Sequence, residues 1–388
     1  MRPKPLDGIR VLDLTRLLPG PVATLHLADL GADVIKIEDP LVGDYARTLG
    51  KGEGEDSAYF RMINRNKRGL RLDLKRPEGV DIFLRLARDA DVVVESFRPG
   101  VADRLGIGYE AVRAVNPRVA YCSISGYGQD GPYRHLAGHD LNYLGYAGVL
   151  DQIGPAGGDP AIPNFQVADL LGGALTAAMG ILAAVVEALR TGQGRHVDVS
   201  MTDSVLAHAY FAMLRVNEAG HSAPRGTDLL SGGLPCYAVY RTADGRHMAV
   251  AALEPKFWKT CCEVLGRPDL GVRHWVAGDE AAAVKAELAA LFATRTRDEW
   301  VERFAGADCC VTPVLSPEEA LANEQIQARG LVAEADGLTQ FAPPLKFSEF
   351  DFAVHRSAPK VGQHSAEILL EAGFDPADIA RLQAAGTL

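Results

Sequence analysis

His139 and Asp169 are the residues of this chain whose types and surroundings are best suited to chemistry. His139 lies in the segment AGHDLNYLGYAG, and Asp169 lies in NFQVADLLGGALTAAMG, directly before a long apolar stretch. A histidine that titrates near neutral pH and a facing carboxylate could move a proton on and off carbon. A carboxylate in such a place could also attack an acyl group and form an anhydride. Both residues are therefore candidates for catalysis.

Each candidate also has a structural explanation, which the residues alone leave open. A lone histidine is often a hydrogen-bonded structural residue, and an aspartate just before a helix is well suited to be its N-cap. Glu254 is a third acidic candidate, in LEPKFW, where Pro255 would be the first helical residue. Because a helix start both holds and orients a carboxylate, Asp169 could have a structural and a chemical role at once.

The bulk properties of the chain predict an ordinary globular protein. Of its 388 residues, 47% are hydrophobic and 23% are charged, and the length suggests two domains or one domain with a large insertion. The net charge of -10 argues against nucleic-acid binding, which needs a basic face. The N-terminus lacks the apolar region of a signal peptide, and the longest apolar run, 170–186, is short for a membrane span. We therefore expect a buried core helix there, no membrane association and a cytoplasmic location.

The cysteines and histidines do not show the spacing of a metal site. None of the six cysteines forms a CxxC pair or a Cys/His zinc pattern, so we expect free thiols and no metal. These cysteines are Cys122, Cys236, Cys261, Cys262, Cys309 and Cys310.

The first part of the chain alternates strand and helix patterns. Strands are expected at 9–14, 32–38, 70–74, 91–96, 119–125 and 196–201, with helices at 21–30, 77–89, 170–190 and 203–218. Alternation at this spacing predicts βαβ units and a parallel, doubly wound sheet.

Composition changes near residue 220, where a segment rich in Gly, Ser and Pro reads as an exposed linker. After it, CYAVYRTADGRHMAVAAL predicts a hairpin that turns at 243–245, followed by helices near 256–265 and 280–294. We place a large Rossmann-like domain at 1–225, completed by helices in 331–388, and a small α+β domain at 226–330.

Two further patterns bear on ligand binding. Gly126 to Gly131 fits G-x-G-x-x-G after a strand, but Pro132 follows and no helix begins, so a glycine-rich loop beside the active site is favoured over dinucleotide binding. Basic residues beyond the carboxyl ends of parallel strands suit a phosphorylated cofactor, with a solvated basic face as the alternative. The basic group consists of Arg65, Lys67, Arg68, Arg71, Lys75, Arg98 and Arg104.

Several segments together resemble the CaiB–BaiF family, which comprises class III CoA-transferases and α-methylacyl-CoA racemases. The matching segments span nearly the whole chain and are GIRVLDL, LADLGADVIKIE, NRNKRGLRLDLK, ESFRPGVADRLGIG, SGYGQDGPY and GQGRHVDVSMTDS. The resemblance implies a Rossmann-like large domain built from both chain ends, a small domain between them, and an interlocked homodimer.

The resemblance also implies roles for site residues. Racemases of the family carry a His in GHD-N-Y, an Asp before the long helix and a Glu in EP-F, which match His139, Asp169 and Glu254; Asp140 and Tyr143 match the same segment. Oxalate/formate transferases instead have Gln at Leu18 and a Tyr-Glu or Tyr-Asp pair at Gly138-His139, so this chain departs from that subgroup.

For coenzyme A, the resemblance places Leu72 and Lys75 near the adenine and ribose phosphate, and Phe97 and Arg104 near the pyrophosphate. Asp140 and Tyr143 are further candidates for CoA binding. An Arg that often follows VIKIE in the family is Asp39 here. CoA is expected as part of the substrate, with no prosthetic group.

The favoured hypothesis is 1,1-proton transfer at the α-carbon of a 2-methylacyl-CoA. His139 and Asp169 would be the two bases, Glu254 would hydrogen-bond His139, and N–H groups at the helix start would stabilise an enolate. Burial should raise the pKa of Asp169 so that it can also act as an acid.

Two other readings stay open. A class III CoA-transferase would use Asp169 as the nucleophile that forms an aspartyl anhydride, with His139 only positioning the substrate. A non-catalytic acyl-CoA binding protein would explain the basic group but would leave the acid–base positions idle. The residues do not specify the acyl group, an acceptor acid or a pathway.

Overall fold

The computed structural model describes residues 3–50 and 56–388, which form two compact units. The first unit contains residues up to 147 together with 164–208 and 327–388, so both ends of the chain contribute to it. The second unit contains 148–163 and 209–326. The domains expected at 1–225 with 331–388 and at 226–330 have other bounds here: 148–163 and 209–225 belong to the second unit, and 327–330 belong to the first.

Within the described residues, the main sheet of the first unit has six parallel strands in the order β3-β2-β1-β4-β5-β6. This arrangement confirms the predicted α/β fold with a parallel sheet. The strands are β1 (Arg10–Asp13), β2 (Asp33–Glu38), β3 (Arg68–Arg71), β4 (Val92–Glu95), β5 (Ala120–Ser125) and β6 (Arg195–Ser200). A separate antiparallel pair consists of β10 (Val332–Ala335) and β11 (Leu338–Phe341).

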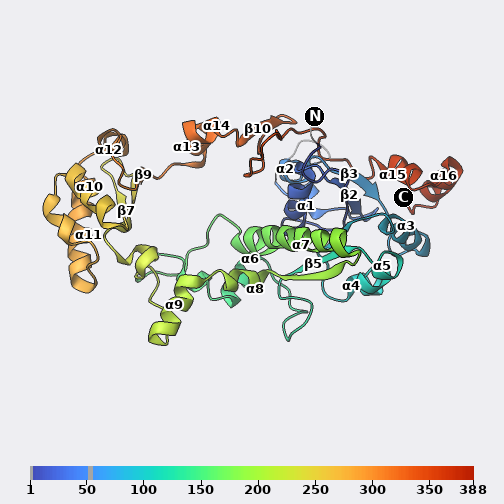
Figure 1. The fold of residues 1–388 in the computed structure, drawn as a ribbon, viewed down its shortest axis with the longest axis horizontal. Coiled ribbons are helices and arrows are strands. Elements are labelled where there is room, and N and C mark those ends of the chain that lie inside the picture. The colour runs from blue at the N-terminus through green and yellow to red at the C-terminus, as the bar shows by residue number, and fades with distance from the viewer. Residues whose placement is uncertain (1–2, 51–55) are drawn as a thin grey trace. The chain divides into compact units, whose positions relative to one another are not determined.

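The helices of the first unit cover the sheet (Figure 1). Their bounds are α1 (Pro19–Asp29), η1 (Tyr45–Thr48), α2 (Ala58–Asn64), α3 (Pro77–Ala87), α4 (Val101–Arg104), α5 (Tyr109–Val115), α6 (Asp140–Tyr146), η3 (Ala168–Leu175), α7 (Thr176–Thr191), α8 (Met201–Ala207), α14 (Glu324–Ala328, at the unit boundary), α15 (Ser365–Glu371) and α16 (Pro376–Ala384).

The C-terminal helices pack back on the first unit, as the sequence suggested. Ile368 and Leu369 of α15 and Leu382 of α16 belong to the same apolar core as Phe83 of α3 and Leu12 of β1. Figure 1 shows α15 and α16, in red, beside the blue α3. Strands buried on both faces need such layers on each side, which explains why their sequences are almost continuously apolar.

The second unit has its own core and its own small sheet. The predicted hairpin is confirmed: β7 (Tyr237–Arg241) pairs antiparallel with β8 (His247–Ala251), and β9 (Val311–Pro313) joins β8. Its helices are η2 (Leu150–Gln152), α9 (Tyr210–Ala219), η4 (Leu229–Gly233), α10 (Pro255–Leu265), η5 (Pro268–Val272), α11 (Gly278–Phe292), α12 (Arg297–Phe304) and α13 (Pro317–Ala322).

Three sequence-based boundaries are wrong for local physical reasons. The helix expected from residue 21 begins at Pro19, because proline is well accommodated in the first helical turn. The strand expected at 70–74 begins at Arg68, whose buried guanidinium is neutralised by Asp33 and two glutamates. The helix expected over 203–218 is split into α8 and α9 where the chain passes from the first unit to the second.

The long apolar helix formed by η3 and α7 spans 24 residues, Ala168–Thr191, and an 18-residue window within it has a mean hydropathy of 1.9. Its length and composition would allow it to cross a membrane, but helices in protein cores have the same length and composition. These two properties are therefore weak evidence for a membrane span. One side of it packs on β5, β6 and α1. The other side exposes Leu175, Met179, Val186 and Leu189.

Candidate active site

A cleft of about 1100 Å³ lies in the first unit, at the carboxyl ends of the central strands. The segments that follow β1, β4 and β5 form its walls at Leu17–Pro19, Ser96–Pro99 and Gly126–Tyr127. The sheet order reverses between β1 and β4, which is where ligands bind in doubly wound folds. His139 and Asp169 both line this cleft, so the tertiary structure brings the two sequence candidates to one cavity.

Asp169 lies inside the first turn of η3, one residue after the helix begins, so its interpretation as the N-cap is wrong. The helix start is capped from another segment: Asp140 Oδ1 accepts the N–H groups of Ala168 at 2.7 Å and Asp169 at 3.1 Å. This contact connects the residue that follows His139 directly to the backbone of Asp169. The helix opens as a π-helix, a form that is often found at functional sites.

Small residues let the Asp169 helix approach the cleft walls closely. A Cβ atom on Gly173 would lie 2.6 Å from Pro19 Cβ, and one on Gly172 would lie 2.8 Å from the carbonyl oxygen of Met201. Any larger side chain would push η3 away from α1 and α8. The DLLGG segment therefore fixes Asp169 relative to the β1–α1 loop through backbone contact.

The carboxyl group of Asp169 has a strongly altered proton affinity. Its pKa is raised from 3.8 to about 7, mainly by burial and to a smaller extent by the negative charge of Asp140. A carboxyl group with a pKa of about 7 exists in both protonation states at neutral pH. It can therefore give and take a proton under physiological conditions, as expected from the sequence.

The same shift predicts a pH-dependent cost in stability. The folded protein binds the Asp169 proton more tightly than the unfolded chain, so the stabilisation is complete below about pH 4 and is lost as the pH rises through about 7. Asp169→Asn should therefore leave the free energy of unfolding almost unchanged at about pH 4 and raise it by roughly 2 to 3 kcal/mol at about pH 8. Thermal melts of both proteins across this range measure the difference, with Asp81→Asn on the exposed face of α3 as the control. An equal stability gain at both pH values would contradict the prediction.

His139 is the N-cap residue of α6, and its own side chain is exposed. Its backbone N–H donates to Asn142 Oδ1 at 3.1 Å, and its carbonyl accepts from the N–H groups of Asn142 and Tyr143. The Tyr143 hydroxyl donates to the carbonyl of Gly138 at 2.5 Å. These contacts hold the backbone on both sides of His139, and the residue lines the cleft.

The glycine-rich loop after β5 packs closely against the ring of Tyr143. A Cβ on Gly126 would lie 2.3 Å from the Tyr143 ring, and one on Gly138 would lie 2.6 Å from it. Gly126 and Tyr127 line the cleft, and α6 begins only at Asp140. The loop therefore shapes the cleft wall, as predicted, and does not open a helix as a dinucleotide fingerprint would.

The loop between β1 and α1 is held in an unusual conformation by buried charges. Leu17 has a φ of +67°, which is rare for a residue with a side chain. Its N–H donates to Asp44 Oδ1 at 3.0 Å, and Asp44 pairs at 2.8 Å with the fully buried ammonium of Lys36. Lys36 also donates to the carbonyl of Thr15. Strain of this kind persists only where the surroundings hold it, and here it places Leu17 and Leu18 on the cleft.

Most of the basic group predicted to bind phosphate has a structural role instead. The ammonium of Lys67 is buried 3.0 Å from Asp13, and the guanidinium of Arg65 is buried 2.6 Å from Asp29. Arg71 donates to the carbonyl of Leu388. Because these cations are already neutralised or hydrogen-bonded inside the fold, neither a phosphate site nor a solvated basic face describes them.

Other side chains at the cleft were missed by the sequence reasoning. Tyr59 lines it, and burial together with the charge of Asp169 raises the pKa of Tyr59 to about 12. Arg16 and Arg134 line it with Arg98, and none of the three forms an ion pair with an Asp or Glu within the described residues. Nothing in their local sequence marks Tyr59 or Arg16, because the cleft is assembled from loops that are distant along the chain.

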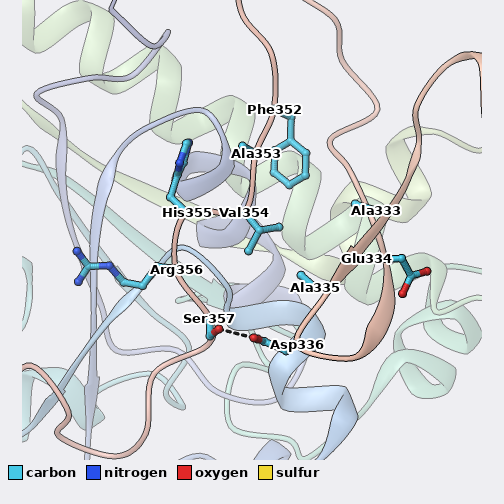
Figure 2. Close-up of a pocket in the computed structure, with 10 residues that line it drawn as sticks. All are labelled: Ala333, Glu334, Ala335, Asp336, Phe352, Ala353, Val354, His355, Arg356 and Ser357. Carbon is cyan, nitrogen blue, oxygen red and sulfur yellow. Dashed lines mark hydrogen bonds between the residues drawn. The ribbon is translucent and has the colours of Figure 1, made fainter.

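A second cavity of the first unit, of about 390 Å³, lies between the β10–β11 hairpin and residues 352–357 (Figure 2). Some of its polar groups have protein partners: the Ser357 hydroxyl donates to the Asp336 carboxylate, and Asn66 Oδ1 accepts the backbone N–H groups of His355 and Arg356. Neither His139 nor Asp169 is among the ten residues that line it. The cleft at the sheet is therefore the better candidate for an active site.

Comparison with known proteins identifies the family of the chain. The family model described as CoA-transferase family III matches residues 6–365. The chain is 37% identical to alpha-methylacyl-CoA racemase from Homo sapiens over 379 residues, which cover 97% of this chain and 96% of that protein. It is 33% identical to succinyl-CoA:glutarate CoA-transferase from Mus musculus over 399 residues, which cover 99% of this chain and 90% of that protein.

The chain belongs to CoA-transferase family III. The crystal structure of a CAIB/BAIF family protein from Brucella suis matches 96% of this chain and 100% of its own, with a TM-score of 0.83 and 32% identity. The resemblance stated from the sequence motifs is therefore confirmed. Membership makes the protein an enzyme that acts on acyl-CoA, and the relatives include both racemases and transferases.

The residues expected to contact CoA have different surroundings. Phe97 lines the cleft, and Arg104 is exposed on α4. Leu72 is buried in the core of the first unit. Lys75 is exposed, and its ammonium lies 3.0 Å from the carboxylate of Asp39, the residue that stands where family III members often have Arg. Their roles toward CoA stay predictions.

Glu254 belongs to the second unit, where it is the exposed N-cap residue of α10 without a side-chain capping bond. Pro255 occupies the first helical position, as predicted. The pairing of Glu254 with His139 of the first unit stays a prediction.

The prediction that N–H groups at the helix start stabilise an enolate is wrong for the first three N–H groups of η3, because each of them already has a protein acceptor. Those of Ala168 and Asp169 donate to Asp140, and that of Leu170 donates to the carbonyl of Gln166 at 2.9 Å. These three N–H groups are therefore not free to donate to a substrate oxygen.

Proposed function

We propose that this family III enzyme is an alpha-methylacyl-CoA racemase or epimerase. The observation that carries the proposal is that Asp169 and His139 line the same cleft, where burial raises the pKa of Asp169 to about 7. A racemase needs two groups that each act as acid in one direction and as base in the other. A carboxyl group with an ordinary pKa near 4 would be a poor acid at neutral pH, whereas Asp169 carries its proton about half of the time.

In the proposed reaction, the base on one face removes the α-proton of a 2-methylacyl-CoA. The electron pair of the C–H bond passes into the thioester carbonyl, and the partner residue returns a proton to the other face. With the opposite enantiomer, His139 and Asp169 exchange roles. Glu254 is proposed to orient the imidazole of His139 by a hydrogen bond.

The three arginines of the cleft suit a phosphorylated and thioester-linked substrate. Arg16, Arg98 and Arg134 have no acidic partner within the described part of the chain, so their charges are available to CoA phosphates. The guanidinium of Arg16 lies 5.7 Å from the centres of the Phe97 and Tyr45 rings, and all three residues line the cleft.

A class III CoA-transferase is the second candidate, supported by the 33% identity to succinyl-CoA:glutarate CoA-transferase over 99% of this chain. Asp169 would attack the thioester and release CoA as a thiolate, leaving an aspartyl anhydride. CoA would then attack the aspartyl carbonyl, so that the first acid leaves and Asp169 carries CoA to a second acid.

One assay separates the two candidates. The enzyme is incubated with a single enantiomer of a 2-methylacyl-CoA in deuterium oxide, without any acceptor acid. A racemase incorporates deuterium at the α-carbon and forms the other enantiomer. Absence of exchange together with CoA transfer after addition of carboxylic acids would reject the racemase and support the transferase.

We also propose that the enzyme is an interlocked homodimer. Leu175, Met179, Val186 and Leu189 form an apolar stripe along the η3–α7 helix, and from 49% to 67% of each of these side chains is exposed. A second copy of the chain would bury this stripe. Light scattering coupled to size exclusion should give about twice the 41.5 kDa of one chain, and a monomer at micromolar concentration would reject the dimer.

A further inference from the structure

Glu95 is a buried acid at the carboxyl end of β4 that the proposed mechanism does not use. It is 3% exposed, and its Oε2 accepts the N–H of Phe97 at 2.7 Å. Phe97 and Arg98 form a wall of the cleft directly after this strand. A buried carboxyl group without a structural or chemical task is costly, so its contacts need an explanation.

A chain of hydrogen bonds leads from Glu95 to the surface. Ser123 lies beside Glu95 on the neighbouring strand β5, is 2% exposed and is hydrogen-bonded to the Glu95 carboxyl group. The Ser123 hydroxyl also lies 3.0 Å from Nε2 of His196 on β6. His196 is exposed at the edge strand of the sheet, where its ring stacks on Tyr109 at 5.1 Å.

The charges around this chain favour a proton on Glu95 near neutral pH. Burial is the main cause that raises the pKa of Glu95; the hydrogen bonds from Ser123 and the Phe97 N–H lower it, the charges of Asp103 of α4 and Asp198 of β6 raise it, and the result is about 7. Burial lowers the pKa of His196, while the same two aspartates and Glu110 oppose that shift. The phenol of Tyr121 and the thiol of Cys122 on β5 stay neutral here, because burial raises their pKa values.

We propose that Glu95 is a positioning residue for the cleft wall at Phe97 and Arg98, and that it exchanges its proton with solvent through Ser123 and His196. The proposal rests on the binding of CoA thioesters in this cleft. It assigns Glu95 no contact with substrate. The residue acts only through the Phe97 amide.

The proton transfer balances along the three groups. A solvent proton binds Nδ1 of His196, the Nε2 proton passes to the Ser123 oxygen, and the Ser123 proton passes to the Glu95 carboxylate. In the reverse direction each group returns the proton that it received. Ionised Glu95 accepts the Phe97 N–H in a charge-assisted bond, which is about twice as strong as the bond to the neutral acid.

The state of Glu95 should therefore alter how firmly the wall binds CoA. Glu95→Gln keeps an acceptor for the Phe97 N–H and a donor for Ser123, so it mimics the protonated acid at every pH. The Kd of free CoA, measured by calorimetry, should be equal for the two proteins at about pH 6 and about fivefold weaker in the variant at about pH 8.5. The comparison is the ratio of the Kd of the variant to the Kd of the wild type at each pH, and any effect of the titration of CoA itself is the same in both values and cancels. Glu78→Gln on the exposed face of α3 is the matched control and should follow the wild type.

Infrared difference spectra between the same pH values provide a second readout. The wild type should show the carbonyl band of a protonated buried carboxylic acid that disappears on ionisation, and Glu95→Gln should lack it. Ser123→Ala should keep the band but slow its appearance after a pH jump, because the link to His196 is broken. A Kd ratio that does not change with pH, or a band that persists in Glu95→Gln, would overturn the proposal.

The outcomes also separate this inference from the proposed function. If the wild type binds no CoA at any pH, the proposed use of the cleft fails while the infrared titration still reports on Glu95. If Glu95→Gln does not fold, the pH-jump comparison of wild type with Ser123→Ala decides, and equal rates would overturn the relay.

Discussion

Asp169→Asn is expected to lower kcat by about 10³-fold or more, whichever of the two proposed reactions the enzyme performs. In proton transfer, the amide can neither remove nor return the α-proton. In CoA transfer, it cannot form the aspartyl anhydride. The side chain has almost the same shape and lies in the first turn of η3, so the capping bonds from Asp140 to the backbone should remain. Steady-state assays of racemisation and of CoA transfer measure the loss.

The stability of this variant separates lost chemistry from lost structure. Because the pKa of Asp169 is raised by burial, the uncharged amide should make the protein more stable at about pH 8 while it removes activity. Asp81→Asn on α3 should keep both properties of the wild type. An active Asp169→Asn enzyme would contradict both mechanisms.

His139→Ala is expected to abolish racemisation, with a loss of about 10²- to 10⁴-fold, and largely to spare CoA transfer. The side chain is exposed at the cleft, while the backbone around it is held by Asn142 and Tyr143, so its removal should leave the fold intact. In deuterium oxide, any residual exchange should be limited to the enantiomer whose α-proton faces Asp169. Chiral separation of the recovered acyl-CoA and mass spectrometry measure the two quantities.

His355→Ala is the matched control, because this histidine lies in the same unit at the second cavity (Figure 2). It should racemise at the wild-type rate. If His139→Ala still racemises, or loses CoA transfer to the same extent, then His139 is not one of two proton-transfer bases.

The sequence alone was sufficient to predict the α/β fold class. Alternation of apolar strands with helices predicts the parallel sheet, because a strand buried on both faces must be continuously apolar and its crossover must be amphipathic. The hairpin at Tyr237–Ala251 was predicted for a similar local reason, namely alternating residues on both sides of a tight turn. The motifs were also sufficient for the family.

The boundaries that failed depend on contacts between distant segments. Arg68 could be placed in a strand only because Asp33, Glu367 and Glu371 neutralise it, and two of these partners lie about 300 residues away. Likewise, the sequence around Lys67 predicts a free cation, whereas in the fold its ammonium is buried in an ion pair with Asp13. Charge at a position is visible in the sequence, but its partner is not.

For the site, the sequence was sufficient to select the candidate groups, since His139 and Asp169 are ionisable residues in apolar, glycine-rich segments. Only the tertiary structure brought them to one cleft and replaced the supposed N-cap at Asp169 with Asp140, which lies 28 residues before the first N–H it caps. It also determined the pKa of Asp169, because that value depends on burial and on a neighbouring charge. Chemical type is a local property of the chain, whereas desolvation, charge and proximity arise from the segments that fold around it.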